Sequence, residues 1–228
     1  MARSSQGTTP RRAPHAADKR VRLSHGQVAR AALELADAEG IDALTMRRLA
    51  DELGVGTMTL YGYFPSKRDL LHAVLDAAVA DRSEAPQPGE GWRERLSALV
   101  RLARDNMLRH PALVEIRVRE PVLRPEALRL AEDGLRILLD AGFPAQEAAH
   151  AFRLLFTYSF GFAVFSPADA VEQDRTAARV AIAALPSGDY PALTGAAAEA
   201  AEAMGGEQAF EYGLARILDG LEARLTGD

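Results

Sequence analysis

Residues 45–64 have the sequence Thr-Met-Arg-Arg-Leu-Ala-Asp-Glu-Leu-Gly-Val-Gly-Thr-Met-Thr-Leu-Tyr-Gly-Tyr-Phe. This stretch predicts two short helices joined by a tight turn. The apolar residues of the first helix recur at helical spacing: Met46, Leu49, Ala50 and Leu53. Thr45 is placed to cap this helix, and Gly54 can adopt the positive φ that ends it. Two such helices also occur in ordinary all-α cores. Their exposed face therefore has to distinguish a DNA-binding pair from a purely structural one.

The second helix has an unusual outer face. Leu60 and Phe64 fall on its inner side, where they would be buried. We expect the other side chains to point outward: Thr57, Met58, Thr59, Tyr61 and Tyr63. A helix of this length with small, hydroxylated and aromatic outer residues suits the major groove of DNA, which is wide enough to admit it.

The order of residues around this stretch closely resembles the DNA-binding domain of TetR-family transcriptional regulators. The resemblance runs from about Leu23 to Leu75 and rests on four quoted segments: Gly40-Ile41-Asp42-Ala43-Leu44-Thr45, Leu49-Ala50-Asp51-Glu52-Leu53-Gly54-Val55, Thr59-Leu60-Tyr61-Gly62-Tyr63-Phe64 and Lys67-Arg68-Asp69-Leu70-Leu71. Gly62 departs from the family pattern, because related sequences commonly carry a large side chain there. A glycine cannot read a base, so specificity must rest more on four other residues: Arg47, Thr57, Met58 and Tyr63.

The resemblance implies a set of DNA-contacting residues: Arg47, Thr57, Met58, Thr59, Tyr61, Tyr63 and Lys67. Arg47 corresponds to a position that can reach a base edge, where a guanidinium binds guanine O6 and N7. Tyr61 and Lys67 match phosphate-contacting positions, and Met58 and Thr59 can meet a thymine methyl group or the backbone. Arg48 is either a further DNA contact or a solvated surface charge.

Charge is segregated along the chain. The 228 residues carry a net charge of −5, but residues 1–82 have a net charge of +2 and residues 83–228 of −7. The basic part coincides with the predicted DNA-binding head, and an acidic body would be held away from the phosphates.

Several function classes are excluded by composition and motifs. The absence of Cys rules out disulfides, thiolate metal sites and Cys nucleophiles. No nucleotide-binding, metalloprotease or hydrolase motif occurs, and the five His lack metal-ligand spacing. We therefore expect no enzyme activity, cofactor or metal. No apolar run reaches the roughly 18 to 20 residues of a membrane span, and no secretory signal is present, so we expect a cytoplasmic protein without a membrane partner.

The sequence predicts an all-α fold with an N-terminal three-helix helix-turn-helix DNA-binding head and a larger helical ligand-binding and dimerisation domain. Residues 1–22 are expected to be a disordered basic arm, which either strengthens DNA contacts or is an inert tail. Residues 23–82 form the predicted head and residues 90–228 the larger domain, with a boundary in the Pro/Gly-rich stretch 86–89.

Capping signals and apolar periodicity place the helices. Two residue pairs form capping signals, each before a head helix: Ser24 with Gln27 before 25–39, and Ser66 with Asp69 before 67–82. In the larger domain we expect one helix from Trp92 to the His110-Pro111 break, then helices over 113–118, from after Pro125 to Gly142, 145–165 and 210–225, with short Ala-rich helical pieces over 166–206.

The resemblance implies a homodimer in which helices 145–165 and 210–225 of two subunits form a four-helix bundle. Alternatively, these apolar stripes belong to an intrachain core. In the dimer the two recognition helices would lie roughly 34 to 36 Å apart, so the partner is double-stranded DNA with a palindromic operator.

A small-molecule effector of unknown identity is the second expected partner. Its pocket would be lined by residues of the larger domain: Trp92, Arg104, Met107, His110, Phe152, Phe156 and Tyr158. Arg104 and His110 could orient an anionic or phenolic ligand. The alternative for each of these residues is that it belongs to the packed core.

We therefore predict a ligand-responsive transcriptional repressor that is released from its operator by a small molecule. Two other classes stay open: a DNA-binding regulator without a small-molecule ligand, and a helical small-molecule enzyme or carrier whose head only resembles a DNA binder.

Overall fold

The computed structural model describes residues 23–80, 91–119, 128–166 and 170–226, and every regular element within these ranges is an α-helix. The predicted all-α fold class is therefore confirmed. The head contains α1 (His25–Glu39), α2 (Met46–Glu52), α3 (Thr57–Tyr63) and α4 (Lys67–Ala80). The rest consists of α5 (Trp92–Arg109), α6 (Pro111–Arg119), α7 (Arg129–Asp140), α8 (Ala145–Phe165), α9 (Val171–Ala183), α10 (Pro191–Gly195), α11 (Ala197–Glu202) and α12 (Glu207–Thr226). The predicted arm and the predicted boundary at 86–89 lie outside the described residues.

Local signals set the ends of the head helices where the sequence predicts them. Ser24 Oγ accepts the Gln27 backbone N–H at 3.1 Å, and Gln27 Oε1 accepts the Ser24 backbone N–H at 2.8 Å, which completes the capping box of α1. Thr45 Oγ1 caps α2 by accepting the Arg48 N–H at 3.1 Å. Gly54 has φ of 63°, a left-handed conformation that turns the chain from α2 toward α3.

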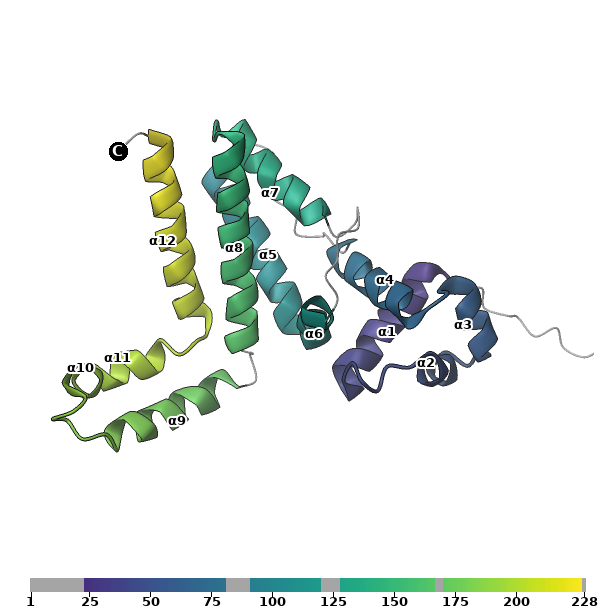
Figure 1. Ribbon diagram of the computed structural model, residues 1–228, viewed down its shortest axis with the longest axis horizontal. Helices are drawn as coiled ribbons and strands as arrows, with labels where there is room; N and C mark the ends of the chain where they lie inside the picture. The colour runs from purple at the N-terminus through teal and green to yellow at the C-terminus, as the bar shows by residue number, and fades with distance from the viewer. Residues whose placement is uncertain (1–22, 81–90, 120–127, 167–169, 227–228) are drawn as a thin grey trace, which may run out of the picture.

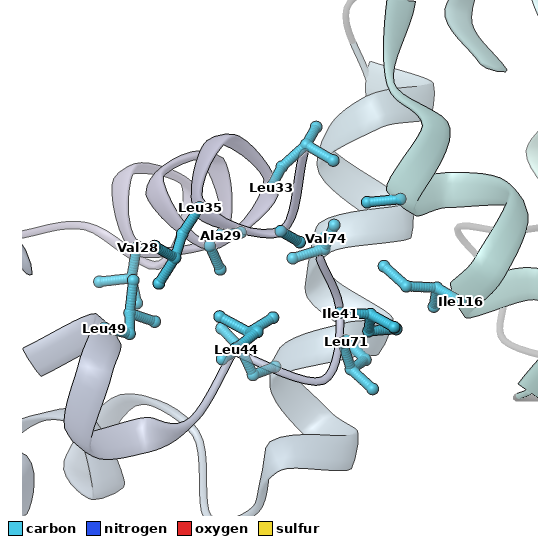
Figure 2. Packing of buried hydrophobic residues seen from close by; sticks show 14 of the residues in the cluster. Val28, Ala29, Leu33, Leu35, Ile41, Leu44, Leu49, Leu71, Val74 and Ile116 are labelled. Carbon is cyan, nitrogen blue, oxygen red and sulfur yellow. The ribbon is translucent and has the colours of Figure 1, made fainter. Parts of the chain in front are cut away.

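The head core is completed by a helix from outside the predicted head. Figure 2 shows Ile116 of α6 beside Ile41 and Leu71, in the cluster that also contains Val74 of α4. Ile116 is fully buried at 0 % exposure, and Ala112 and Leu113 of α6 belong to the same cluster. The predicted head of residues 23–82 is thus not the whole of this core, since α6 supplies one side of it.

A second core joins α5, α7, α8 and α12. Its largest fully buried side chains come from four different helices: Leu96, Leu138, Leu155, Phe210 and Leu214. In Figure 1, α8 and α12 stand side by side, with α5 and α7 on the other side of α8. The short helices α9, α10 and α11 pack on one another and project beyond the lower ends of α8 and α12.

Helix α8 is more apolar than the sequence analysis allows. By length and composition it could cross a membrane, with a mean hydropathy of 1.2, and 28 % of the apolar window is buried within the protomer. The expectation that no apolar run has this length was wrong, because Arg153 and a few other polar residues interrupt the run without lowering its mean hydropathy enough. Length and composition do not distinguish a membrane span from a core helix, and α8 packs against α5, α7 and α12.

Candidate nucleic-acid interface and ligand site

Helix α3 presents an exposed face held by two buried anchors. Leu60 and Phe64 are buried in the head core. Met58 is 82 % exposed and Tyr61 44 % exposed, Thr59 is exposed, and Thr57 is partly exposed at the start of the helix. Gly62 is exposed too, and a Cβ added there would meet no atom within 4 Å. The outer face is therefore free to approach another molecule.

Tyr63 does not belong to that outer face. Its hydroxyl donates a hydrogen bond to the Leu23 carbonyl at 2.8 Å, and its ring packs edge-on against His25 at 5.2 Å between centroids. The expectation that Tyr63 points outward was wrong. It lies three residues after Leu60, so helical geometry places it on the anchored side. Tyr63 joins the start of α1 to the end of α3.

The basic residues near this face differ in whether they are already paired. Arg47 is exposed and has no ion pair among the described residues. Arg48 binds Glu39 at 2.6 Å and Glu52 at 2.8 Å, which favours its interpretation as a surface charge. Lys67 Nζ donates to the Ile41 carbonyl at 3.1 Å, and an ammonium retains two further N–H donors for a phosphate.

Two of the predicted ligand-binding residues, Phe152 and Phe156, line a small cavity between α5, α7 and α8. The other lining residues are mostly apolar: Leu96, Leu99, Val100, Ala103, Leu130, Leu155 and Ser159. The free volume is about 20 Å³, room for about one water molecule. A larger ligand therefore has to displace the two aromatic rings or move α7.

Three other candidates pack elsewhere. Trp92 packs edge-on against Phe143 at 5.3 Å. Tyr158 stacks on Phe210 at 5.3 Å, and its hydroxyl donates to the Phe210 carbonyl at 2.7 Å. Burial raises the pKa of the Tyr158 phenol above its ordinary value. Met107 is partly buried but does not line the cavity. Trp92 and Tyr158 therefore act as core residues in this structure.

The two predicted polar anchors are occupied by carboxylates of the protein. Arg104, buried in the domain core, binds Glu207 at 2.5 Å, and its guanidinium lies 4.4 Å from the Phe210 ring centroid. His110 Nδ1 lies 2.6 Å from Asp37 Oδ2. Neither residue lines the cavity. The structure thus uses Arg104 to fix α12 and His110 to join α1 to the α5–α6 junction.

Asp37 is a functional candidate that sequence reasoning missed. Besides contacting His110, its Oδ1 accepts the backbone N–H of Ala112 at 3.1 Å, in the first turn of α6. A helix N-terminus has free N–H groups and a positive dipole, so a carboxylate there stabilises it. Asp37 and Ala112 are too far apart in sequence for a local capping pattern to reveal this contact.

Comparison with known proteins identifies the family. The domain described as "Bacterial regulatory proteins, tetR family" matches residues 29–74, and "Tetracyclin repressor-like, C-terminal domain" matches residues 85–225. The chain belongs to the TetR family. The predicted family membership is therefore confirmed over both parts of the chain.

Individual TetR-family relatives cover most of the chain. The HTH-type transcriptional repressor DrrR1 of Streptomyces coeruleorubidus is 34 % identical over 90 % of this chain and 79 % of its own length. The Streptomyces coelicolor TetR-family protein ActR, solved in complex with actinorhodin, is 28 % identical with a TM-score of 0.73, covering 89 % of this chain and 98 % of ActR. BioQ with its double-stranded DNA operator is 25 % identical with a TM-score of 0.60, covering 89 % of this chain and 99 % of BioQ.

The described part of the chain groups no three His, Cys, Asp or Glu residues in a way that could hold a metal ion. DrrR1 is named as a transcriptional repressor and BioQ was solved with its DNA operator, which agrees with the predicted function as a DNA-binding transcriptional regulator.

Proposed function

We propose that this TetR-family protein is a ligand-responsive transcriptional repressor that binds a palindromic operator as a homodimer in the bacterial cytoplasm. The exposed face of α3 carries the proposal, because Leu60 and Phe64 hold the helix while Thr59, Met58 and Tyr61 stay free. Such a helix reads base edges in the major groove. The DNA-bound BioQ structure and the repressor DrrR1 support this assignment.

The homodimer is supported by apolar side chains left exposed on α8 and α12. Leu154 and Phe165 on α8 and Tyr212 on α12 are exposed in the single chain, although both helices are otherwise core elements. A second copy packed on these helices buries them and sets the two α3 helices on successive turns of DNA, roughly 34 to 36 Å apart.

Ligand response follows from the position of α6 between the two cores. Its Ile116 side chain is buried in the head, while α6 also contacts α5 and α8 of the ligand domain. A ligand that enlarges the cavity between α5, α7 and α8 therefore displaces a helix on which the head packs. Linkage then requires that operator binding lowers ligand affinity by the same factor by which ligand lowers operator affinity.

Selection of bound fragments from random duplex DNA at about 0.15 M salt tests the regulator function, since weak non-specific phosphate binding is suppressed there. A palindromic motif is the expected result, and it supplies the operator for later measurements. Failure to enrich any sequence, with a protein free of co-purified ligand by mass spectrometry, would contradict the proposal.

Replacing Arg47 tests the predicted base contact. We expect Arg47→Ala to weaken operator binding by about 1 to 3 kcal/mol and to relax the sequence preference at one position of each half-site. Arg48→Ala is the matched control, because Glu39 and Glu52 already hold that guanidinium. Fluorescence anisotropy with the selected operator measures both. Equal losses for the two variants would remove Arg47 from the set of base-reading residues.

The small free volume of the cavity favours one alternative, a DNA-binding regulator without a small-molecule ligand. Gly134→Ala distinguishes the two functions, since its Cβ would overlap the Phe152 ring and push it into the cavity. If the cavity admits ligands, the variant binds the apolar dye N-phenyl-1-naphthylamine about tenfold more weakly, as overpacking of 1 to 3 kcal/mol implies.

Gly62→Ala is the control for the Gly134 substitution, because an added Cβ has open space there and the residue lies in the head. Fluorescence titration should show unchanged dye affinity for this control. If the dye fails to bind the unsubstituted protein, the regulator acts without a ligand of this kind.

A further inference from the structure

Arg117 lies against the wall of the ligand cavity. It belongs to α6, is partly buried, and places its guanidinium carbon 5.3 Å from the centroid of the Phe156 ring. Phe156 itself lines the cavity, next to Phe152 at 6.3 Å. Arg117 follows Ile116, so one residue of α6 packs in the head core while the next contacts the ligand domain.

The exposed Arg153 supplies a second guanidinium, whose positive charge acts on Arg117. Arg153 is on α8, three residues before Phe156, and residues at this spacing share a helix face. Burial and then the positive charge of Arg153 lower the pKa of Arg117 below its ordinary value. Two cations beside an apolar cavity repel each other, and this cost is removed when an anion binds between them.

Three other arginines that are buried or partly buried bind carboxylates of the protein. Arg93 binds Asp219 and Glu222, Arg104 binds Glu207, and Arg175 binds Glu202. Within the described residues, Arg117 and Arg153 have no carboxylate partner at ion-pair distance. A partly buried guanidinium without a counter-ion is unfavourable, so an external anion is the group that completes this site.

We propose, on the basis of the ligand-responsive function above, that the effector is a planar aromatic compound with an acidic group, whose ring enters between Phe152 and Phe156 and whose anion binds Arg117 and Arg153. A guanidinium binds a carboxylate or a sulfonate through paired charge-assisted hydrogen bonds. The aromatic part supplies the contacts that open the cavity. Because Arg117 and Ile116 are neighbours on α6, an anion that draws Arg117 toward Arg153 also moves the helix that packs under the head.

Two dyes with the same aromatic skeleton test the site in the full-length protein. The anion 8-anilino-1-naphthalenesulfonate differs from N-phenyl-1-naphthylamine by its sulfonate alone. We expect the sulfonate to bind about tenfold more tightly in fluorescence titrations, and this preference to vanish in the double variant Arg117→Gln, Arg153→Gln. Affinity for the neutral dye should stay within about twofold, since the apolar cavity is unchanged.

Two further variants keep the test decisive. Arg109→Gln removes an exposed arginine of α5 and should retain the preference for the sulfonate. Arg117→Lys keeps the positive charge and should retain most of the preference for the sulfonate. This result would show that loss of the preference in the Gln variants does not come from misfolding. Cooperative thermal unfolding followed by circular dichroism checks each variant.

Equal affinity for the two dyes, a preference that survives in the double variant, or binding of neither dye would overturn the inference. The regulator function is tested separately by DNA selection with the same preparations. Recovery of a palindromic operator without a sulfonate preference would retain the repressor and reject the acidic effector. Recovery of the sulfonate preference without a palindromic operator would retain the acidic ligand and reject the repressor function.

Discussion

Ile116→Ala is expected to destabilise the DNA-binding head, although the residue lies far beyond the head in sequence. Ile116 has no exposed surface and packs beside Ile41 and Leu71, as Figure 2 shows. Removing a fully buried aliphatic side chain and leaving a cavity costs about 2 to 5 kcal/mol. We expect this loss in the free energy of unfolding measured with urea, and weaker protection of α1 and α4 amides in hydrogen exchange.

Val118→Ala is the matched control for this prediction. Val118 lies on the same helix but is 68 % exposed, so its truncation should change stability by less than about 0.5 kcal/mol. Operator affinity provides the second readout, because a head that loses its support by α6 holds α3 less firmly. A loss below about 1 kcal/mol for Ile116→Ala, or protection lost only in α5, α7 and α8, would show that α6 does not belong to the head core.

The elements of the head could be predicted closely because local chemistry decides them. The Ser24–Gln27 capping box and the Thr45 cap depend on residues three positions apart, and Gly54 is needed for one positive φ. Periodicity similarly predicts α8, whose bounds Ala145–Phe165 agree with the expectation. These features are readable from a short window because their partners lie within the same window.

Three of the predicted site residues have partners that are distant in sequence. Tyr63 bonds to Leu23, Arg104 to Glu207 and His110 to Asp37. Sequence reasoning treated Tyr63 as a DNA-reading residue and the other two as ligand anchors because a polar or aromatic residue on a helix looks available until its neighbours are known. The same limit hid Arg117 and Arg153, which are notable only because no carboxylate of the described chain faces them.

Asp37→Ala is expected to loosen the connection between the head and the ligand domain. The substitution removes two interactions of one carboxylate, the contact with His110 at 2.6 Å and the hydrogen bond from the Ala112 N–H at 3.1 Å. Loss of a helix cap costs about 0.5 to 2 kcal/mol. Loss of a partly buried charged hydrogen bond costs about 1.5 to 3 kcal/mol. We therefore expect a total of about 2 to 5 kcal/mol in the free energy of unfolding.

The Asp37 substitution should also reduce the coupling between ligand and operator, because the head is then joined to α6 by apolar packing alone at this end of the helix. Operator affinity measured with and without the bound dye gives the coupling as a ratio. Asp42→Ala is the matched control. Asp42 also joins the head to α6, through Arg119. The hydrogen bond from Arg119, and then its positive charge, lower the pKa of the Asp42 carboxyl, but the Asp42 side chain is 85 % exposed.

An exposed ion pair is screened by water, so the Asp42 variant should leave both stability and coupling nearly unchanged. If the two variants behave alike, the contact with the first turn of α6 has no special role. If Asp37→Ala loses stability but keeps the full coupling ratio, Asp37 supports the fold without transmitting the ligand signal, and the apolar contact of Ile116 alone carries it.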